Sequence, residues 1–201
     1  MKCRTIVVAA ALVLASSPSA AQLYLFAGIG AANPKFSDED FNLGVPRRSD
    51  TKDSTFHIGA GYRFSPHWAA EIGYADLGEY SFTHTDGVGD TFNERYRVKG
   101  LKLAALGIWP ASERFSLYAK LGIASTKAEW EGNFVIGGVA GPQQSGDHRR
   151  NSLLAGFGAQ YNITPRFGVR GEFENWGEAG NENDTGRAKM NSFNLLGVLN
   201  F

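Results

Sequence analysis

The sequence is poor in cysteine, in long apolar segments and in net charge, and each shortage excludes a class of protein. Cys3 is the only cysteine among 201 residues, so an internal disulfide framework is excluded. Twenty basic residues balance twenty acidic ones, which does not favour nucleic-acid binding. Beyond the N-terminus, no stretch approaches the roughly 18 apolar residues of a transmembrane helix. If the chain spans a membrane, it must do so as β-strands.

The first 21 residues have the pattern of a secretory signal peptide. Lys2 and Arg4 precede ten apolar residues at 6–15, and small residues follow up to Ala21. The apolar segment is too short to span a membrane as a helix. We therefore expect export to the periplasm, cleavage near Ala21 and a single folded domain at residues 22–201.

Eight later segments alternate apolar residues with polar or small ones, which predicts β-strands with one apolar face. The segments are residues 23–32, 55–64, 68–77, 96–109, 115–126, 152–163, 167–176 and 190–201. Their length suits tilted strands that cross a bilayer. The fourth segment alternates less cleanly, and we expect a β-bulge near Gly100.

Short and long connections alternate along the chain. The short ones each contain proline and lie at residues 65–67, 110–114 and 164–166, whereas the long polar ones lie at 33–54, 78–95, 127–151 and 177–189. Outer-membrane barrels have short periplasmic turns and longer extracellular loops. The sequence therefore predicts an all-β fold, an eight-stranded antiparallel up-and-down transmembrane β-barrel.

Aromatic residues gather at the ends of the predicted strands, as expected for side chains at the two membrane interfaces. Beside the short turns or at the end of the chain are Phe64, Trp68, Trp109, Phe115, Tyr161, Phe167 and Phe201. Near the long loops are Phe56, Tyr96, Trp176 and Phe193. We interpret them as two aromatic belts.

Four features are informative together: the signal peptide, the strand count, the Glu-Ile-Gly-Tyr-Ala-Asp-Leu-Gly stretch at 71–78 and the final Phe201. In these features the chain resembles the outer-membrane protein A-type family of small eight-stranded barrels. The resemblance covers nearly all of residues 22–201 and implies the outer membrane of a Gram-negative bacterium. It also implies a last strand read by the barrel-assembly machinery, through Phe193, Leu195, Leu199 and Phe201. Larger members carry a peptidoglycan-binding domain after the barrel, and we expect none here.

The interior of an eight-stranded barrel is just wide enough to be filled by side chains. Strand alternation directs seven charged residues inward, together with Tyr118, Gln160 and Asn194: Arg63, Glu71, Lys102, Lys120, Arg170, Glu172 and Glu174. Buried charges are costly unless paired, so we expect a network of ion pairs. Such a network would either plug the lumen or, by exchanging partners, gate a narrow water path; related barrels contain an interior charge network.

The predicted function is a structural or surface-interaction role in the envelope, without cofactor, metal or catalytic residues. The alternatives are a narrow channel for ions or small solutes, an enzyme that modifies lipid A, and a soluble lipocalin-type barrel. An enzyme would need a nucleophile and a base near the lipid-facing rim, and no His-x-Ser pair lies on a predicted strand. A soluble barrel would need its outward apolar residues covered.

Two basic clusters in the long loops, Arg47-Arg48 and Arg149-Arg150, are candidate contacts for lipopolysaccharide phosphates. The glycine-rich segment 132–146 is a second candidate surface, for a host or other external ligand. The predicted partners are therefore outer-membrane lipid, lipopolysaccharide and the assembly machinery.

Overall fold

The computed structural model describes residues 22–36, 47–50, 53–85, 90–181 and 186–201. The predicted signal peptide lies outside these residues. Every regular element in the described ranges is a β-strand. These ranges contain no helix that is long and apolar enough to cross a membrane.

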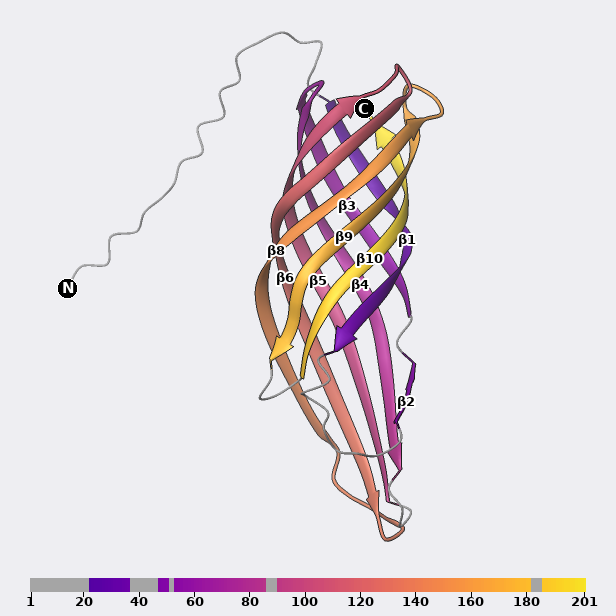
Figure 1. Cartoon of the computed structure of the whole chain (residues 1–201), viewed down its shortest axis with the longest axis vertical. Coiled ribbons are helices and arrows are strands. Elements are labelled where there is room, and N and C mark those ends of the chain that lie inside the picture. Colours follow the sequence, from indigo (N-terminus) through magenta and orange to yellow (C-terminus); the bar gives the residue numbers. More distant parts are fainter. Residues whose placement is uncertain (1–21, 37–46, 51–52, 86–89, 182–185) are drawn as a thin grey trace, which may run out of the picture.

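Eight strands close into an antiparallel barrel in which each strand pairs with its neighbours in the chain (Figure 1). They are β1 (Gln22–Phe36), β3 (Asp53–Ser65), β4 (Trp68–Thr85), β5 (Thr91–Pro110), β6 (Phe115–Ile136), β8 (Gln144–Asn162), β9 (Phe167–Asn181) and β10 (Gly186–Asn200). Strand β1 closes the barrel, because Ala27 faces Ile58 of β3 on one side and Gly197 of β10 on the other. The predicted eight-stranded up-and-down barrel is confirmed.

One wall of the barrel is much longer than the other. Strands β4, β5, β6 and β8 extend beyond the ends of β1, β9 and β10 on the long-loop side (Figure 1). Two short strands add to this wall: β2 (Arg47–Asp50) pairs with β4, and β7 (Val139–Ala140) pairs with the end of β6. We call the extension of these strands beyond the shorter wall the protruding sheet.

The protruding sheet corrects the prediction that residues 78–95 and 127–151 are long loops. Strand β5 pairs with β6 without interruption from Pro110 to Thr91, and β6 pairs with β8 as far as Gly132. Backbone pairing continues here, whereas the outward face changes from apolar to charged residues. The apolar alternation that identifies a membrane strand therefore ends before the strand does.

The β-bulge predicted near Gly100 lies instead on the adjacent strand β4. Leu77 and Gly78 together oppose Val98 of β5, and the register shifts between Asp76 and Glu79. Gly78 has a φ of 100°, a conformation that favours glycine, and its N–H donates to Asp76 Oδ1 at 3.1 Å. The alternation of β5 around Gly100 is regular.

Strand β9 contains a second β-bulge with the same local chemistry. Its register with β10 shifts where Trp176 and Gly177 oppose a single residue. Gly177 has a φ of 72°, and its N–H donates to Asn175 Oδ1 at 3.0 Å. The bulge lets Trp176 and, three residues later, Ala179 both face the interior, where each is buried.

The outer surface of the barrel is apolar. Aromatic side chains predicted beside the short turns or at the end of the chain are all at least 38% exposed on this surface: Phe64, Trp68, Trp109, Phe115, Tyr161, Phe167 and Phe201. The second predicted belt is partly wrong. Phe56 and Phe193 do lie outside, but Tyr96 and Trp176 point inward and are buried.

Candidate functional site

The candidate site is a cluster of charged side chains inside the barrel, and β9 supplies three of them. Arg170, Glu172 and Glu174 occur at every second position of β9, so all three point inward. Lys102 of β5 and Lys120 of β6 complete the cluster from the facing strands, with Glu71 of β4. Each of the six side chains is at most 3% exposed. We call these six residues the lumen network.

Lys120 is the centre of the lumen network. Its Nζ lies 3.0 Å from Glu71 Oε2, 2.9 Å from Glu172 Oε2 and 2.8 Å from Glu174 Oε1. Lys102 Nζ donates to Glu174 Oε1 at 2.5 Å and lies 3.6 Å from Glu172 Oε1. The two ammonium groups therefore share the carboxylates of Glu172 and Glu174.

Arg170 binds the third carboxylate. Its Nη1 donates to Glu71 Oε1 at 2.5 Å, and its Nε and Nη2 both donate to Gln160 Oε1, at 3.1 and 2.8 Å. Three cations thus face three carboxylates, and the set has no net charge. Removing charges from water is costly, and close pairing with added hydrogen bonds is what offsets that cost.

Neutral side chains donate further hydrogen bonds to the carboxylates. Tyr24 Oη donates to Glu71 Oε1 at 2.8 Å, and Tyr118 Oη donates to Glu172 Oε2 at 2.7 Å. Asn194 Nδ2 is 3.3 Å from Glu174 Oε2. Each carboxylate therefore receives at least one hydrogen bond from an uncharged group. Tyr118, Gln160 and Asn194 were predicted to point inward, but Tyr24 was not. Its neighbours Leu23 and Leu25, which are exposed on the outer surface, were the available signal.

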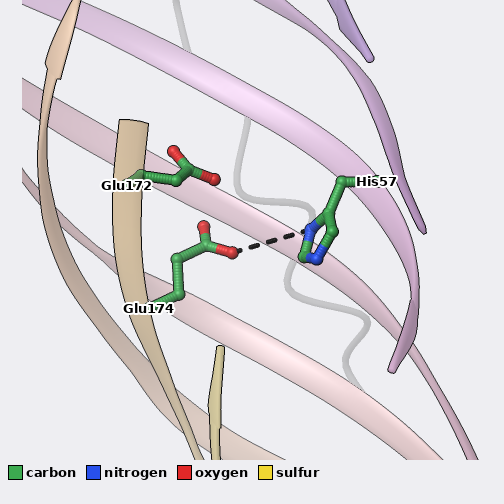
Figure 2. A group of neighbouring side chains, drawn as sticks. All are labelled: His57, Glu172 and Glu174. Carbon is green, nitrogen blue, oxygen red and sulfur yellow. Dashed lines mark ion pairs between the residues drawn. The ribbon is translucent and has the colours of Figure 1, made fainter. Parts of the chain in front are cut away.

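His57 of β3 is a second residue that the predicted network omitted. Figure 2 shows its ring facing the two glutamates of β9, with Nδ1 3.8 Å from Glu174 Oε2. Its Nε2 is 3.2 Å from Thr55 Oγ1. The alternation of β3 directed His57 inward, but nothing local to β3 showed that the carboxylates of β9 would lie opposite.

The group formed by His57, Glu172 and Glu174 has the donor atoms of a metal site, all within 4.8 Å of one another. Both carboxylates, however, are already paired with Lys102 and Lys120. A divalent cation would add positive charge to a set that is already neutral, next to two ammonium groups. The donor geometry is present, but the electrostatics favour the ion pairs.

Apolar layers lie on both sides of the lumen network. Along β9 the inward series Arg170, Glu172, Glu174 continues to Trp176 on the long-loop side, and Lys102 Nζ lies 5.2 Å from the Trp176 ring. On the short-turn side the inward series of β5 passes from Lys102 to Leu106, which is fully buried. Phe26 lies among the network cations, with its ring 5.7 Å from both Lys102 Nζ and Arg170 Cζ.

Glycines make room for these large side chains. A Cβ on Gly59 would lie 2.3 Å from Phe26 Cζ, and one on Gly61 would lie 2.1 Å from Tyr24 Cζ. A Cβ on Gly100 would lie 2.8 Å from a ring carbon of Trp176. The aromatic layers and the glycines of neighbouring strands therefore fit together.

Arg63, predicted as a seventh member, does not join the lumen network. It is half-buried near the short-turn end of β3 and makes no ion pair within the described residues. Its inward direction was foreseen, but it lies too close to the barrel mouth to reach the carboxylates. Inward direction alone does not determine depth along the lumen.

The four arginines predicted to contact lipopolysaccharide lie on two strands, β8 and β2. Arg149 and Arg150 are consecutive on β8, not in a loop; Arg149 is exposed, and Arg150 Nη2 donates to Glu178 Oε2 at 2.7 Å. Arg47 and Arg48 form part of β2, opposite His84 and Thr83 of β4. Their side chains lie outside the described part of the structure.

The residues of the predicted assembly signal lie at the seam of the barrel. Three of them lie on β10 and Phe201 follows it directly, and all four are exposed on the outer surface by 43–66%: Phe193, Leu195, Leu199 and Phe201. The Phe201 N–H donates to the Leu23 carbonyl at 3.0 Å. Recognition of these residues by assembly machinery stays a prediction.

A closed antiparallel barrel with an apolar outer surface and a buried ionic interior defines a small outer-membrane β-barrel protein. The chain belongs to the family described as OmpA-like transmembrane domain, which matches residues 18–200. It is 28% identical over 158 residues to outer membrane protein A of Shigella flexneri, covering 77% of this chain and 42% of that protein. For outer membrane protein A of Salmonella typhi the identity is 27% over 177 residues, covering 86% and 47%.

The chain thus spans less than half the length of these curated relatives. Among solved structures it is similar in fold to OprG from Pseudomonas aeruginosa, with a TM-score of 0.59, 12% identity and coverage of 90% and 96% of the two chains. It is also similar to Ail of Yersinia pestis, solved with the heparin analogue sucrose octasulfate, with a TM-score of 0.52, 19% identity and coverage of 90% and 99%. The protein is located in the bacterial outer membrane, as predicted.

Proposed function

We propose that the protein is a non-enzymatic outer-membrane anchor with a closed lumen, which supports the envelope and presents its protruding sheet at the cell surface. The observation that carries this proposal is the neutral lumen network enclosed between apolar layers. Lys102, Lys120 and Arg170 balance three carboxylates, and none of the six side chains is more than 3% exposed.

A conducting path would have to cross the apolar layers as well as the lumen network. Leu77, Tyr80 and Trp176 on the long-loop side are at most 1% exposed, and Leu106 on the short-turn side is fully buried. Apolar constrictions block ions because water is unstable in them. A rearrangement of ion pairs alone would therefore leave the lumen closed.

A narrow channel is the second candidate, and one detail of the lumen network favours it. Glu172 Oε1 accepts no hydrogen bond from the described residues and lies only 3.6 Å from Lys102 Nζ. A small movement would transfer Lys102 from Glu174 to Glu172. Such an exchange of partners is the elementary step that a gate would need.

Planar-bilayer recording of the purified protein separates the two candidates. We expect no reproducible conductance from the wild-type protein or from Lys102→Gln, because the apolar layers remain in both. Trp176→Ala, which removes the largest side chain of one layer, is expected to produce brief openings, whereas Trp109→Ala on the outer surface is the matched control and stays closed. If the wild-type protein gave regular conductance steps, and if Lys102→Gln altered those steps, the closed lumen would be refuted and the channel established.

A lipid-modifying enzyme would need its base on the lipid-facing surface. His57 is fully buried inside the barrel, and its described hydrogen-bond partner is Thr55. His67 lies in the short turn between β3 and β4, and His148 lies on β8. Mass spectra of lipid A from cells with and without the protein are expected to be identical; a new or missing acyl chain or phosphate would overturn the non-enzymatic proposal.

A further inference from the structure

The three short turns are built in the same way. Each ends in a basic residue that is followed directly by an exposed aromatic one: His67-Trp68, Arg114-Phe115 and Arg166-Phe167. The carbonyl of each basic residue accepts a hydrogen bond of 2.7–2.8 Å from a backbone N–H of a neighbouring strand. A hydroxyl group within each turn accepts a further bond from a backbone N–H. Each turn therefore holds a basic residue at a fixed place on the periplasmic rim, beside the apolar outer surface.

The turn that ends in Arg166 has no acidic neighbour. Arg166 is exposed and makes no ion pair within the described residues. Glu113, the acidic residue of the short turns, precedes Arg114 in a different turn. The nearest outward residues on the two adjoining strands are Phe167 of β9 and Leu199 of β10. The Arg166 guanidinium is therefore available to an anion.

An apolar groove of about 340 Å³ lies on the lipid-facing surface beside this turn. Its floor is formed by two small residues that directly oppose each other, Ala27 of β1 and Gly197 of β10. Larger outward side chains, each 43–48% exposed, border it: Leu25, Ile58, Phe167 and Leu199. A depression of this kind accommodates an alkyl chain more closely than the surrounding surface does. We call it the seam groove.

The Arg166 turn and the seam groove adjoin each other. The Asn200 N–H donates to the Arg166 carbonyl at 2.7 Å, which fixes the turn to the end of β10. Phe167 lies opposite Leu199, and its ring extends toward the groove floor, since a Cβ on Gly197 would lie 3.6 Å from Phe167 Cε2. Gly197 is two residues from Leu199, about 7 Å along the strand. The cation thus lies at headgroup height and the groove at the height of the first acyl carbons.

We propose that the Arg166 turn and the seam groove bind one phospholipid with an anionic headgroup in the periplasmic leaflet. The guanidinium of Arg166 forms charge-assisted hydrogen bonds with the phosphate oxygens, and one acyl chain lies over Ala27 and Gly197. A zwitterionic headgroup would add an ammonium group, for which the turn offers no side-chain carboxylate. The site goes beyond the proposed function and does not depend on whether the lumen is closed.

The test is a titration of the refolded, detergent-solubilised protein with phosphatidylglycerol and, separately, with phosphatidylcholine. Native mass spectrometry counts the bound lipid. Arg166→Gln removes the cation, and its matched control is Arg114→Gln in the turn of the same construction. Gly197→Leu fills the seam groove, and its matched control is Ala119→Leu on the outer face of β6. Heat-modifiable gel mobility verifies that each variant is folded.

We expect Arg166→Gln to weaken phosphatidylglycerol binding about fivefold, from the usual contribution of a basic residue at a membrane surface, and to remove the preference over phosphatidylcholine. Gly197→Leu is expected to weaken the binding of both lipids equally, because it leaves the headgroup position unchanged. Both controls are expected to bind as the wild-type protein does.

Three results would overturn the proposal. The first is a wild-type protein that does not prefer phosphatidylglycerol. The second is a loss in either variant that is no larger than the loss in its control. The third is displacement of the lipid by glycerol phosphate at a matching concentration, because the site would then recognise phosphate without the acyl chain.

Discussion

The central position of Lys120 makes a specific prediction about stability. In Lys120→Met the shape of the side chain is largely kept, but the ammonium group that lies within 3.0 Å of three carboxylates is lost. Two cations, Lys102 and Arg170, then face three buried carboxylates. One negative charge is left without compensation inside the barrel.

The cost follows from that charge imbalance. Removing one partner of a buried ion pair destabilises a protein by about 3–5 kcal/mol, since the remaining charge stays buried. Adding Glu172→Gln restores neutrality, with two cations facing two carboxylates. We therefore expect Lys120→Met/Glu172→Gln to cost less than the sum of the two single variants, by about 1–3 kcal/mol.

Urea-induced unfolding of the four proteins in lipid vesicles measures these free energies as a double-mutant cycle. Lys127→Met is the matched control: Lys127 also makes two ion pairs, but its side chain is 36% exposed on the outer face of the protruding sheet. Its loss is expected to cost less than about 1 kcal/mol. The reasoning would be refuted if Lys120→Met cost no more than this control, or if the two network substitutions were additive.

Two further predictions concern packing and titration. Gly59→Ala places a Cβ 2.3 Å from Phe26 Cζ and is expected to destabilise the barrel by about 1–3 kcal/mol. The control in the same unfolding assay is Gly171→Ala, which is expected to be near-neutral because no atom lies within 4 Å of the added Cβ. The hydrogen bond from Lys127 lowers the pKa of Glu129 below its ordinary 4.5, so this carboxylate stabilises the protruding sheet above that pH and loses its effect as the pH falls through the lowered pKa. NMR titration should show the Glu129 pKa rising in Lys127→Met; an unchanged value would assign the shift to another group.

Much of the barrel was predictable because its signals are local. A strand with one face in lipid alternates with a period of two, as Phe167, Val169 and Phe173 do against Arg170 and Glu172. The same alternation directed all six residues of the lumen network inward. Periodicity assigns a side chain to a face without reference to the rest of the chain.

The errors arose where local alternation stops or shifts. The bulges at Gly78 and Gly177 change which of the following residues face inward, so Ala179 is interior. Trp176 continues the regular inward series of β9 and belongs to the interior, not to an aromatic belt. Polar stretches beyond the membrane were interpreted as loops because they lack an apolar face. In the structure Lys127 and Arg149 lie on paired strands of the protruding sheet.

The one-dimensional pattern of residues determined that this chain forms an eight-stranded outer-membrane barrel and which charges enter its lumen. Only the folded barrel decided that Lys120 contacts three carboxylates, that Arg63 contacts none of them and that His57 faces Glu174. The physical reason is register: alternation assigns each side chain to a face, but hydrogen bonding between strands decides which residues lie at the same height.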